Sequence, residues 1–319
     1  QLPIMEGDKF AGFVDVLSMT AKKFDKDKLV DTEIPADLND RISEIKDTLN
    51  EAIAETSEEL MEKFFSGEEF DADDIKNGLS AGIGDGSIAP VFCGSALLNQ
   101  GISALMDAII AYMPSPDCKP SFKAKKHGSD TTVELKNSPD ESLSALVFKT
   151  IADPFVGKIS IFRVYSGTMK SDSVVYNTTS EKNEKIAQVF MLRGKKQLPV
   201  DKLIAGDIGA VAKLQFTNTN DTLCDQANPV ELEKIVFPEP SLELAIEPKA
   251  KGDEEKINSG LTKLQDEDPT FKVTLNTETR QTVISGVGEQ HLDVIVSKLK
   301  AKFGVSVNLI DPKVPYRET

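Results

Sequence analysis

The chain has 319 residues, 39% of them hydrophobic, and a formal net charge of −15. This length predicts two or three domains with substantial cores, and because no apolar run reaches about 18 residues we expect no transmembrane helix. The three cysteines, Cys93, Cys118 and Cys224, are far apart and odd in number. Their spacing argues against a disulfide framework and against a CxxC metal site, and it favours a reducing, cytoplasmic location.

The charge is unevenly distributed along the chain. Residues 1–118 hold 9 Lys and Arg against 24 Asp and Glu, whereas residues 119–319 hold 28 of each. The net charge therefore lies in the first part, either as a solvated acidic face or as a surface for a basic partner, and the neutral second part can carry a nucleic-acid surface. Residues 1–6 lack the features of a signal peptide, and their start in mid-pattern favours an internal piece of a longer protein.

Residues 1–118 predict a mixed α/β domain. The apolar spacing predicts a strand over 10–17, which a charged stretch follows, and then a helix over 42–53. A Thr56/Glu59 capping box is expected to open a further helical turn, and Asp71 to cap the next helix. A short buried strand over 88–93 and a helix over 105–112 complete the pattern. The glycine cluster 82–86 predicts a loop. Prolines at 114, 116 and 120 end the last helix and mark a domain boundary near residue 118.

Residues 119–237 have a different pattern, which predicts a closed β-barrel. Strand-like runs occur at 143–151, 158–165, 173–178, 185–192 and 208–214, and turn signals separate them at 153–154, 166–167, 180–183 and 205–207. Several strands of this length with no helical period among them are typical of a barrel.

Residues 238–310 show the clearest periodicity in the chain. Alternating or short apolar runs at 242–246, 271–275, 283–284 and 305–309 predict four strands. Apolar residues spaced by three and four at 257–264 and 292–303 predict two helices, and Gly304 is expected to end the second. The order β-α-β-β-α-β is that of the ferredoxin-like fold.

The chain lacks the motifs that would predict a catalytic or metal site. It contains no G-x-x-x-x-G-K-[ST] string, which holds nucleotide phosphates in P-loop hydrolases. Gly286 and Gly288 lie between a strand and a helix, but the third glycine of a dinucleotide fingerprint is replaced by His291, so we expect an ordinary strand-to-helix turn. The two histidines, His127 and His291, have no Cys or carboxylate at ligand spacing and predict neither a zinc site nor a catalytic triad.

Several strings, read together and in order, resemble elongation factor G. Residues 142–168, 205–208 and 221–225 resemble its second domain, and residues 237–240, 267–271 and 286–293 resemble its third. Residues 94–97 and 99–101 resemble the end of its GTPase domain, the acidic helical stretch before them resembles an insertion of that subfamily, and residues 314–319 resemble the start of its fourth domain.

This resemblance implies a multidomain α+β and β architecture. Residues 1–118 would be the C-terminal part of a GTPase domain with an acidic insertion, 119–237 a β-barrel, 238–310 a ferredoxin-like domain and 311–319 the start of a truncated domain. The parent protein would be a translational GTPase that uses GTP and Mg²⁺ to move tRNA and mRNA through the ribosome. The fragment lacks the phosphate-binding loop, so we expect it to be inactive and to hold no bound cofactor. We also expect it to be a monomer.

The same resemblance suggests where ligands would bind. The main-chain N–H groups of Ser95, Ala96 and Leu97 would contact the guanine base, since a strand end that opens into a helix has free donors. Small-subunit rRNA and the ribosomal stalk protein are the implied partners. The cations expected to reach RNA phosphates are Lys158, Arg163, Arg193, Lys195 and Lys196. The alternatives are an ordinary turn at 95–97 and a solvated hairpin at 193–196.

Other readings stay open at this point. A ribosomal-protection or release-factor-type GTPase would share the barrel but should lack the acidic insertion, and a non-enzymatic RNA-binding barrel would need exposed stacking aromatics. The sequence departs from the family pattern at Asn220, where glycine is usual, and at Gln290, where leucine is usual. The linker 119–139 resembles nothing in the family. These departures indicate a divergent copy.

Overall fold

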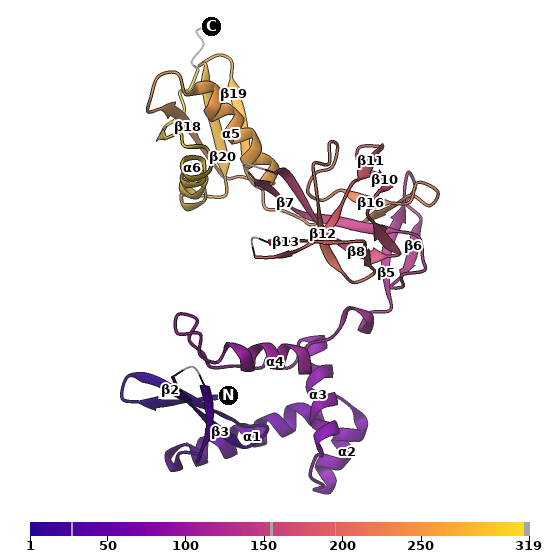
Figure 1. Cartoon of the computed structure of the whole chain (residues 1–319), viewed down its shortest axis with the longest axis vertical. Coiled ribbons are helices and arrows are strands. Elements are labelled where there is room, and N and C mark those ends of the chain that lie inside the picture. The colour runs from indigo at the N-terminus through magenta and orange to yellow at the C-terminus, as the bar shows by residue number, and fades with distance from the viewer. Residues whose placement is uncertain (27, 154–155, 195, 316–319) are drawn as a thin grey trace. The chain divides into compact units, whose positions relative to one another are not determined.

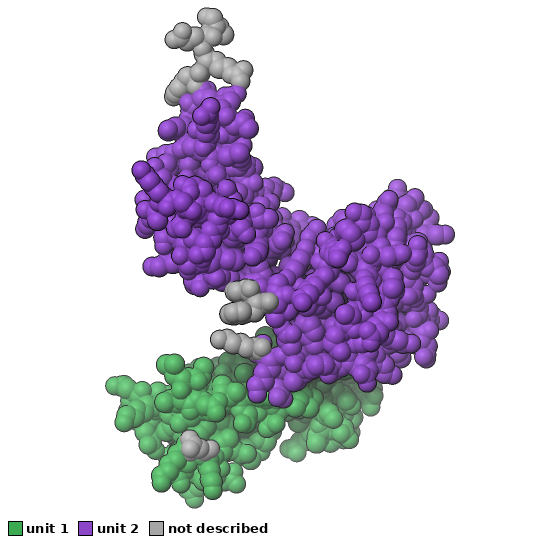
Figure 2. Space-filling view, turned by 45° about the horizontal axis from the view of Figure 1, so that its top comes forward, with its two compact units in different colours: residues 1–115 green, residues 116–319 purple. Residues whose placement is uncertain are grey.

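The computed structural model describes residues 1–26, 28–153, 156–194 and 196–315 (Figure 1). It divides into two compact units, Gln1–Ser115 and Pro116–Thr319, which are coloured separately in Figure 2. Residues 316–319, expected to begin a further domain, lie outside the described residues. In the part of the chain that is described, no helix is both long and apolar enough to cross a membrane.

The first unit combines an antiparallel sheet with four α-helices. The sheet has the order β1-β2-β3-β4, with strands Leu2–Glu6 (β1), Lys9–Asp15 (β2), Thr20–Asp25 (β3) and Lys28–Thr32 (β4). The helices are Asn39–Ala54 (α1), Glu58–Ser66 (α2), Ala72–Asp85 (α3) and Ile102–Tyr112 (α4). One core joins the sheet to α1 through Ile4, Val14 and Ile42, and a second joins α1, α2 and α3 through Ile53, Leu60 and Leu79.

Two helix starts in this unit can be compared with their predictions. Asp71 caps α3 as expected, in a reciprocal capping box with Asp74. The predicted Thr56/Glu59 capping box is wrong by one residue, because Ser57 is the N-cap of α2 and its side chain accepts from the Leu60 N–H. The Thr56 hydroxyl instead donates to the Ile53 carbonyl and closes the end of α1.

Three further predictions for this unit are corrected by the structure. The charged stretch after residue 17 contains β3 and β4, whose Lys and Asp residues interrupt any apolar alternation. The expected loop at 82–86 is mostly the last turn of α3, because Ile83 continues the apolar face of Leu79 and packs into the same core. Residues 88–93 are not a buried strand. Val91 is 72% exposed, and within the described residues no strand ladder forms there.

The second unit begins with a domain built on a curled sheet. Eight strands lie in the order β11-β10-β16-β7-β8-β15-β12-β13. They are Ser144–Asp153 (β7), Gly157–Ser166 (β8), Ser173–Asn177 (β10), Lys182–Ile186 (β11), Val189–Arg193 (β12), Lys196–Val200 (β13), Ile208–Ala212 (β15) and Thr222–Cys224 (β16). Thr168–Lys170 (β9) and Lys202–Ile204 (β14) pair in a separate two-stranded sheet.

The curl of this sheet follows from one short connection. The predicted single strand 185–192 is two strands, β11 and β12, because Ala187 and Gln188 interrupt it. β11 is the first strand of the sheet order and β12 the seventh, so two connecting residues must bridge the ends of the sheet, and these can span only ~10 Å. Among the described residues no ladder joins β11 to β13, so the expected closed barrel is a curled sheet around one core.

A three-stranded sheet covers part of the curled sheet. Its order is β17-β5-β6, with strands Ser121–Lys126 (β5), Thr132–Lys136 (β6) and Val230–Leu232 (β17). Ala124, Val230 and Leu232 pack with Leu146 and Cys224 of the curled sheet in a common core. The linker 119–139, which resembled nothing in the sequence, is thus part of a folded sheet.

The last domain has the predicted β-α-β-β-α-β order. Its elements are Leu242–Pro248 (β18), Glu254–Glu267 (α5), Lys272–Asn276 (β19), Gln281–Gly286 (β20), Glu289–Phe303 (α6) and Val307–Ile310 (β21). The strands form an antiparallel sheet in the order β19-β20-β18-β21. Leu261 of α5 and Leu292 of α6 share one core with Ile284 of the sheet, so both helices cover the same face. Gly304 ends α6 with a φ of 70°, as predicted.

Candidate functional site

The turn before α4 offers free main-chain donors. Two backbone hydrogen bonds of 2.9 and 3.0 Å between Ser95 and Gln100 close it, and Gly101 follows with a φ of 79°. A Cβ at Gly101 would lie 2.5 Å from the Cys93 carbonyl oxygen, so only glycine fits there. Ala96 and Leu97 lie at the exposed tip, and within the described residues their N–H groups have no acceptor. The turn can therefore donate two hydrogen bonds to a ligand acceptor.

A cavity of about 740 Å³ lies elsewhere in the first unit. It opens between the sheet, α1 and α4, and Phe13, Ile45, Ala108 and Tyr112 contribute to its mostly apolar wall. Ser95, Ala96 and Leu97 are not among the residues that line it. The free donors of the turn thus belong to the open surface of this unit.

The cations expected to reach RNA fall into two groups. Lys158 donates from Nζ to Asn218 Oδ1 at 2.6 Å, and the Arg163 guanidinium lies over the rings of Phe122 and Tyr165 at 5.6 and 5.2 Å. These two side chains are half-buried and already engaged.

Arg193 and Lys196 face each other at the end of the β12–β13 hairpin, and both are exposed. Lys195, the fifth predicted cation, lies outside the described residues. The hairpin cations are therefore the ones that can reach a phosphate without breaking an internal contact.

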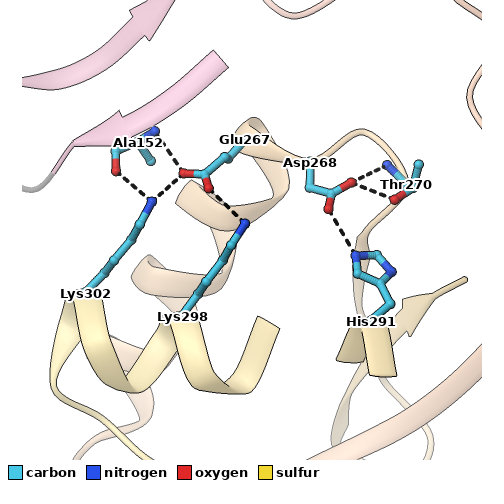
Figure 3. A network of polar contacts seen from close by, with 7 residues as sticks. All are labelled: Ala152, Glu267, Asp268, Thr270, His291, Lys298 and Lys302. Atoms are coloured by element: carbon cyan, nitrogen blue, oxygen red, sulfur yellow. Dashed lines mark hydrogen bonds and ion pairs between the residues drawn. The ribbon is translucent and has the colours of Figure 1, made fainter. Parts of the chain in front are cut away.

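A polar network links α5 and α6 to the curled sheet (Figure 3). Glu267, at the end of α5, accepts from Lys302 at 2.6 Å and from Lys298 at 3.1 Å, and it also accepts from the Ala152 N–H of β7 at 3.2 Å. Lys302 donates in addition to the Ala152 carbonyl at 3.3 Å. Burial by itself would raise the pKa of the Glu267 carboxyl, but the three hydrogen bonds outweigh it and lower that pKa.

A second carboxylate, Asp268, fixes the turn before α6. Val287 N–H donates to Nδ1 of His291 at 3.1 Å, so the ring carries its proton on Nε2 and donates it to Asp268 at 3.0 Å. Asp268 also accepts from the N–H and hydroxyl of Thr270. Burial would raise the Asp268 pKa, but these hydrogen bonds lower it. His291 therefore joins two turns of the domain as a structural residue.

Comparisons with known proteins now agree on one family. Residues 142–226 match the family model described as elongation factor G domain 2, and residues 237–311 match the one described as Elongation Factor G, domain III. Together the two models span half of the chain, in the order that the resemblance implied. The chain belongs to the elongation factor G family. The curled sheet is its domain 2, and the β-α-β-β-α-β domain is its domain III.

A solved structure extends the similarity beyond these two domains. A protein of Thermus thermophilus is 28% identical, with a TM-score of 0.80 over 99% of this chain. The chain spans 45% of the length of that protein.

Sequence reasoning missed the contacts between the two elongation factor G domains. Glu267 and Asp268 lie within a string that carried the family resemblance, but nothing in their spacing gave them partners in β7 or α6. The Asn220 departure is explained by the backbone, since its φ is 77°, a left-handed conformation that glycine and asparagine adopt more readily than other residues. The structure gives no particular role to Gln290.

Proposed function

We propose that this chain is part of a ribosome-dependent GTPase of the elongation factor G type, which moves tRNA and mRNA through the ribosome. The observation that carries the proposal is the order of the two family matches, domain 2 followed by domain III. The similarity over 99% of the chain supports the same assignment for the first unit, as the end of a GTPase domain with an acidic insertion. In such an enzyme Mg²⁺ and the phosphate-binding loop hold most of the nucleotide charge.

The experiment that tests this proposal uses the longer protein that contains residues 1–319. Its GTP hydrolysis should be slow alone and rise strongly when ribosomes are added, measured by phosphate release. Movement of mRNA on stalled ribosomes, followed with a fluorescent mRNA end, should require the same protein. Hydrolysis that ribosomes leave unchanged would contradict the proposal.

The 319-residue chain itself should neither bind GTP tightly nor hydrolyse it. The free donors at Ala96 and Leu97 can supply one or two neutral hydrogen bonds, each contributing about 0.5–1.5 kcal/mol. Association costs at least several kcal/mol, so the affinity should be no better than roughly millimolar. Calorimetry with GTP and Mg²⁺ measures it. Micromolar binding would place the nucleotide site among residues 1–319 and overturn this part of the proposal.

The acidic helices of the first unit are proposed to bind the basic ribosomal stalk protein. Helix α2 begins with Glu58 and Glu59, and Phe65 on the same helix is 80% exposed. Opposite charges speed encounter and make binding depend on salt. Titration of labelled stalk C-terminal domain should show binding at low salt that weakens at high salt. Replacing Glu58, Glu59 and Glu62 with lysine should weaken the binding seen at low salt. If the unaltered chain does not bind at low salt, the proposal is wrong.

A further inference from the structure

Strand β7 of the curled sheet has an edge that other strands leave partly open. β16 pairs with it only over Ser144–Leu146. At the next residue, Val147, the loop before β16 pairs with the strand instead. The Asn220 N–H donates to the Val147 carbonyl at 2.7 Å, and the Val147 N–H donates to the Asp221 carbonyl at 3.0 Å. Five residues further along β7, the backbone of Ala152 forms hydrogen bonds with the side chains of Glu267 and Lys302 of domain III. The loop that carries Asn220 and the two charged residues of domain III therefore bind the same edge of β7.

Asn220 ties the segment between the two domains to this edge. Its Oδ1 accepts from the Ile235 N–H and its Nδ2 donates to the Ile235 carbonyl, both at 2.8 Å. One side chain thus satisfies both backbone groups of Ile235, as a neighbouring strand would. A glycine at position 220 could adopt the φ of 77° but could not make either bond.

Glu267 and Lys302 make an equivalent contact at Ala152. The carboxylate accepts from the N–H, the ammonium donates to the carbonyl, and the two side chains bind each other at 2.6 Å (Figure 3). The Glu267 side chain is 11% exposed, so water competes weakly for these bonds. Because Ala152 takes part only through its backbone, the contact depends on the two charged residues and on the path of β7.

The chain between the two contacts is short and stiff. Ser241 is fixed to domain III by hydrogen bonds to the Gly286 and Val287 carbonyls, so five residues, 236–240, separate it from Ile235. Two of them, Pro238 and Pro240, have a restricted φ. Along β7 the points at Val147 and Ala152 lie ~17 Å apart. Two attachment points at this spacing resist rotation of one domain about the other far better than one.

We propose that Asn220, with Ile235, and Glu267, with Lys302 and Ala152, form a two-point clamp that holds domains 2 and III as one rigid body. Asn220 is the part of the clamp that a glycine would lack, so the rigidity is a property of this chain's own residues. The clamp goes beyond the proposed GTPase function and does not depend on it.

Distance measurements by pulsed electron paramagnetic resonance on the full chain test the clamp. Spin labels are attached at two exposed positions, through Lys185→Cys in β11 and Asp293→Cys in α6. Cys93 and Cys118 are replaced by serine and the buried Cys224 by alanine. The unaltered clamp should give one narrow distance distribution. Asn220→Gly and Glu267→Gln should each broaden it, and the double variant should broaden it most.

Two further measurements keep the result from reflecting a loss of folding. Amide hydrogen exchange at Ile235 should rise on the order of tenfold or more in Asn220→Gly, while exchange in the core of domain III stays unchanged. Lys302→Met should act like Glu267→Gln, whereas Lys300→Met, an exposed lysine on the same helix, should leave the distribution narrow. A broad distribution with the clamp intact, or narrow ones in all clamp variants, would overturn the proposal.

Discussion

Helix α4 is richer in apolar residues than helix α6, yet it is the less covered of the two. In α6, Leu292, Ile295 and Leu299 are almost fully buried in the core of domain III. In α4, Ile109 and Ile110 are exposed, the latter to 80%, and the buried residue of the helix is the small Ala108. Domain III thus buries the apolar face of its second helix, whereas the first unit leaves much of the apolar surface of α4 exposed.

The largest effect should come from a core residue of the second unit. Phe162 is fully buried at the centre of the curled sheet, so Phe162→Ala should lower the free energy of unfolding by about 3–5 kcal/mol. Ile110→Ala in α4 should change it by less than ~0.5 kcal/mol, because the side chain is already in water. Urea unfolding followed by circular dichroism measures both. A loss of several kcal/mol in Ile110→Ala would break the comparison between the two units.

Acid should weaken the second unit through Glu267 and Asp268. Their pKa values are lowered in the folded state, so their contribution is complete above the unfolded carboxyl values of about 4 and is lost as the pH falls through the folded values. Glu267→Gln should cost ~1.5–3 kcal/mol at neutral pH, the range for hydrogen bonds to charged groups, and flatten this acid dependence. Thermal unfolding from pH 7 to pH 3 checks it. An unchanged acid profile in Glu267→Gln would remove this carboxyl from the explanation.

The smallest effect concerns the exposed hairpin cations. If Arg193 and Lys196 each contact one phosphate, replacing both with alanine should reduce the slope of log affinity against log salt by about 2. Binding of the chain to isolated small ribosomal subunits at several salt concentrations gives this slope. Lys158→Ala is the matched comparison, since its ammonium is held by Asn218 and should contribute less. A larger effect from Lys158 would reverse the ranking of the cations.

The periodicity of apolar residues predicted secondary structure best where one face of an element is buried and the other is exposed to solvent. The β-α-β-β-α-β order of domain III was predictable because its strands alternate and its helices repeat every three to four residues. β3 and β4 were missed because their Lys and Asp residues leave no apolar alternation. Residues 88–93 were mistaken for a strand because an apolar run alone does not supply a pairing partner.

The contacts around the candidate sites were harder to predict than the elements that carry them. Asn220, Glu267 and Lys302 bind backbone groups, and a backbone partner leaves no trace in the residue type at that position. The turn at Ser95 was predictable as a turn, but its closure by Gln100 was not. Hydrogen bonds to backbone groups depend on where separate elements meet in space, and a single sequence does not give that information.

The pairing of β17 with β5 has a consequence for biosynthesis. Leu232 pairs with Ala124, so the three-stranded sheet joins segments about a hundred residues apart in the chain. Ribosomes add ~5–20 residues each second, so β5 waits roughly 5–20 s for its partner to be made. During most of that interval Leu146 of β7 lacks part of its cover, because Cys224, Val230 and Leu232 of the same core are not yet made. The domain can reach its native state only after residue 232 has left the exit tunnel. Pairing of its first strand with its last is therefore a late step of cotranslational folding.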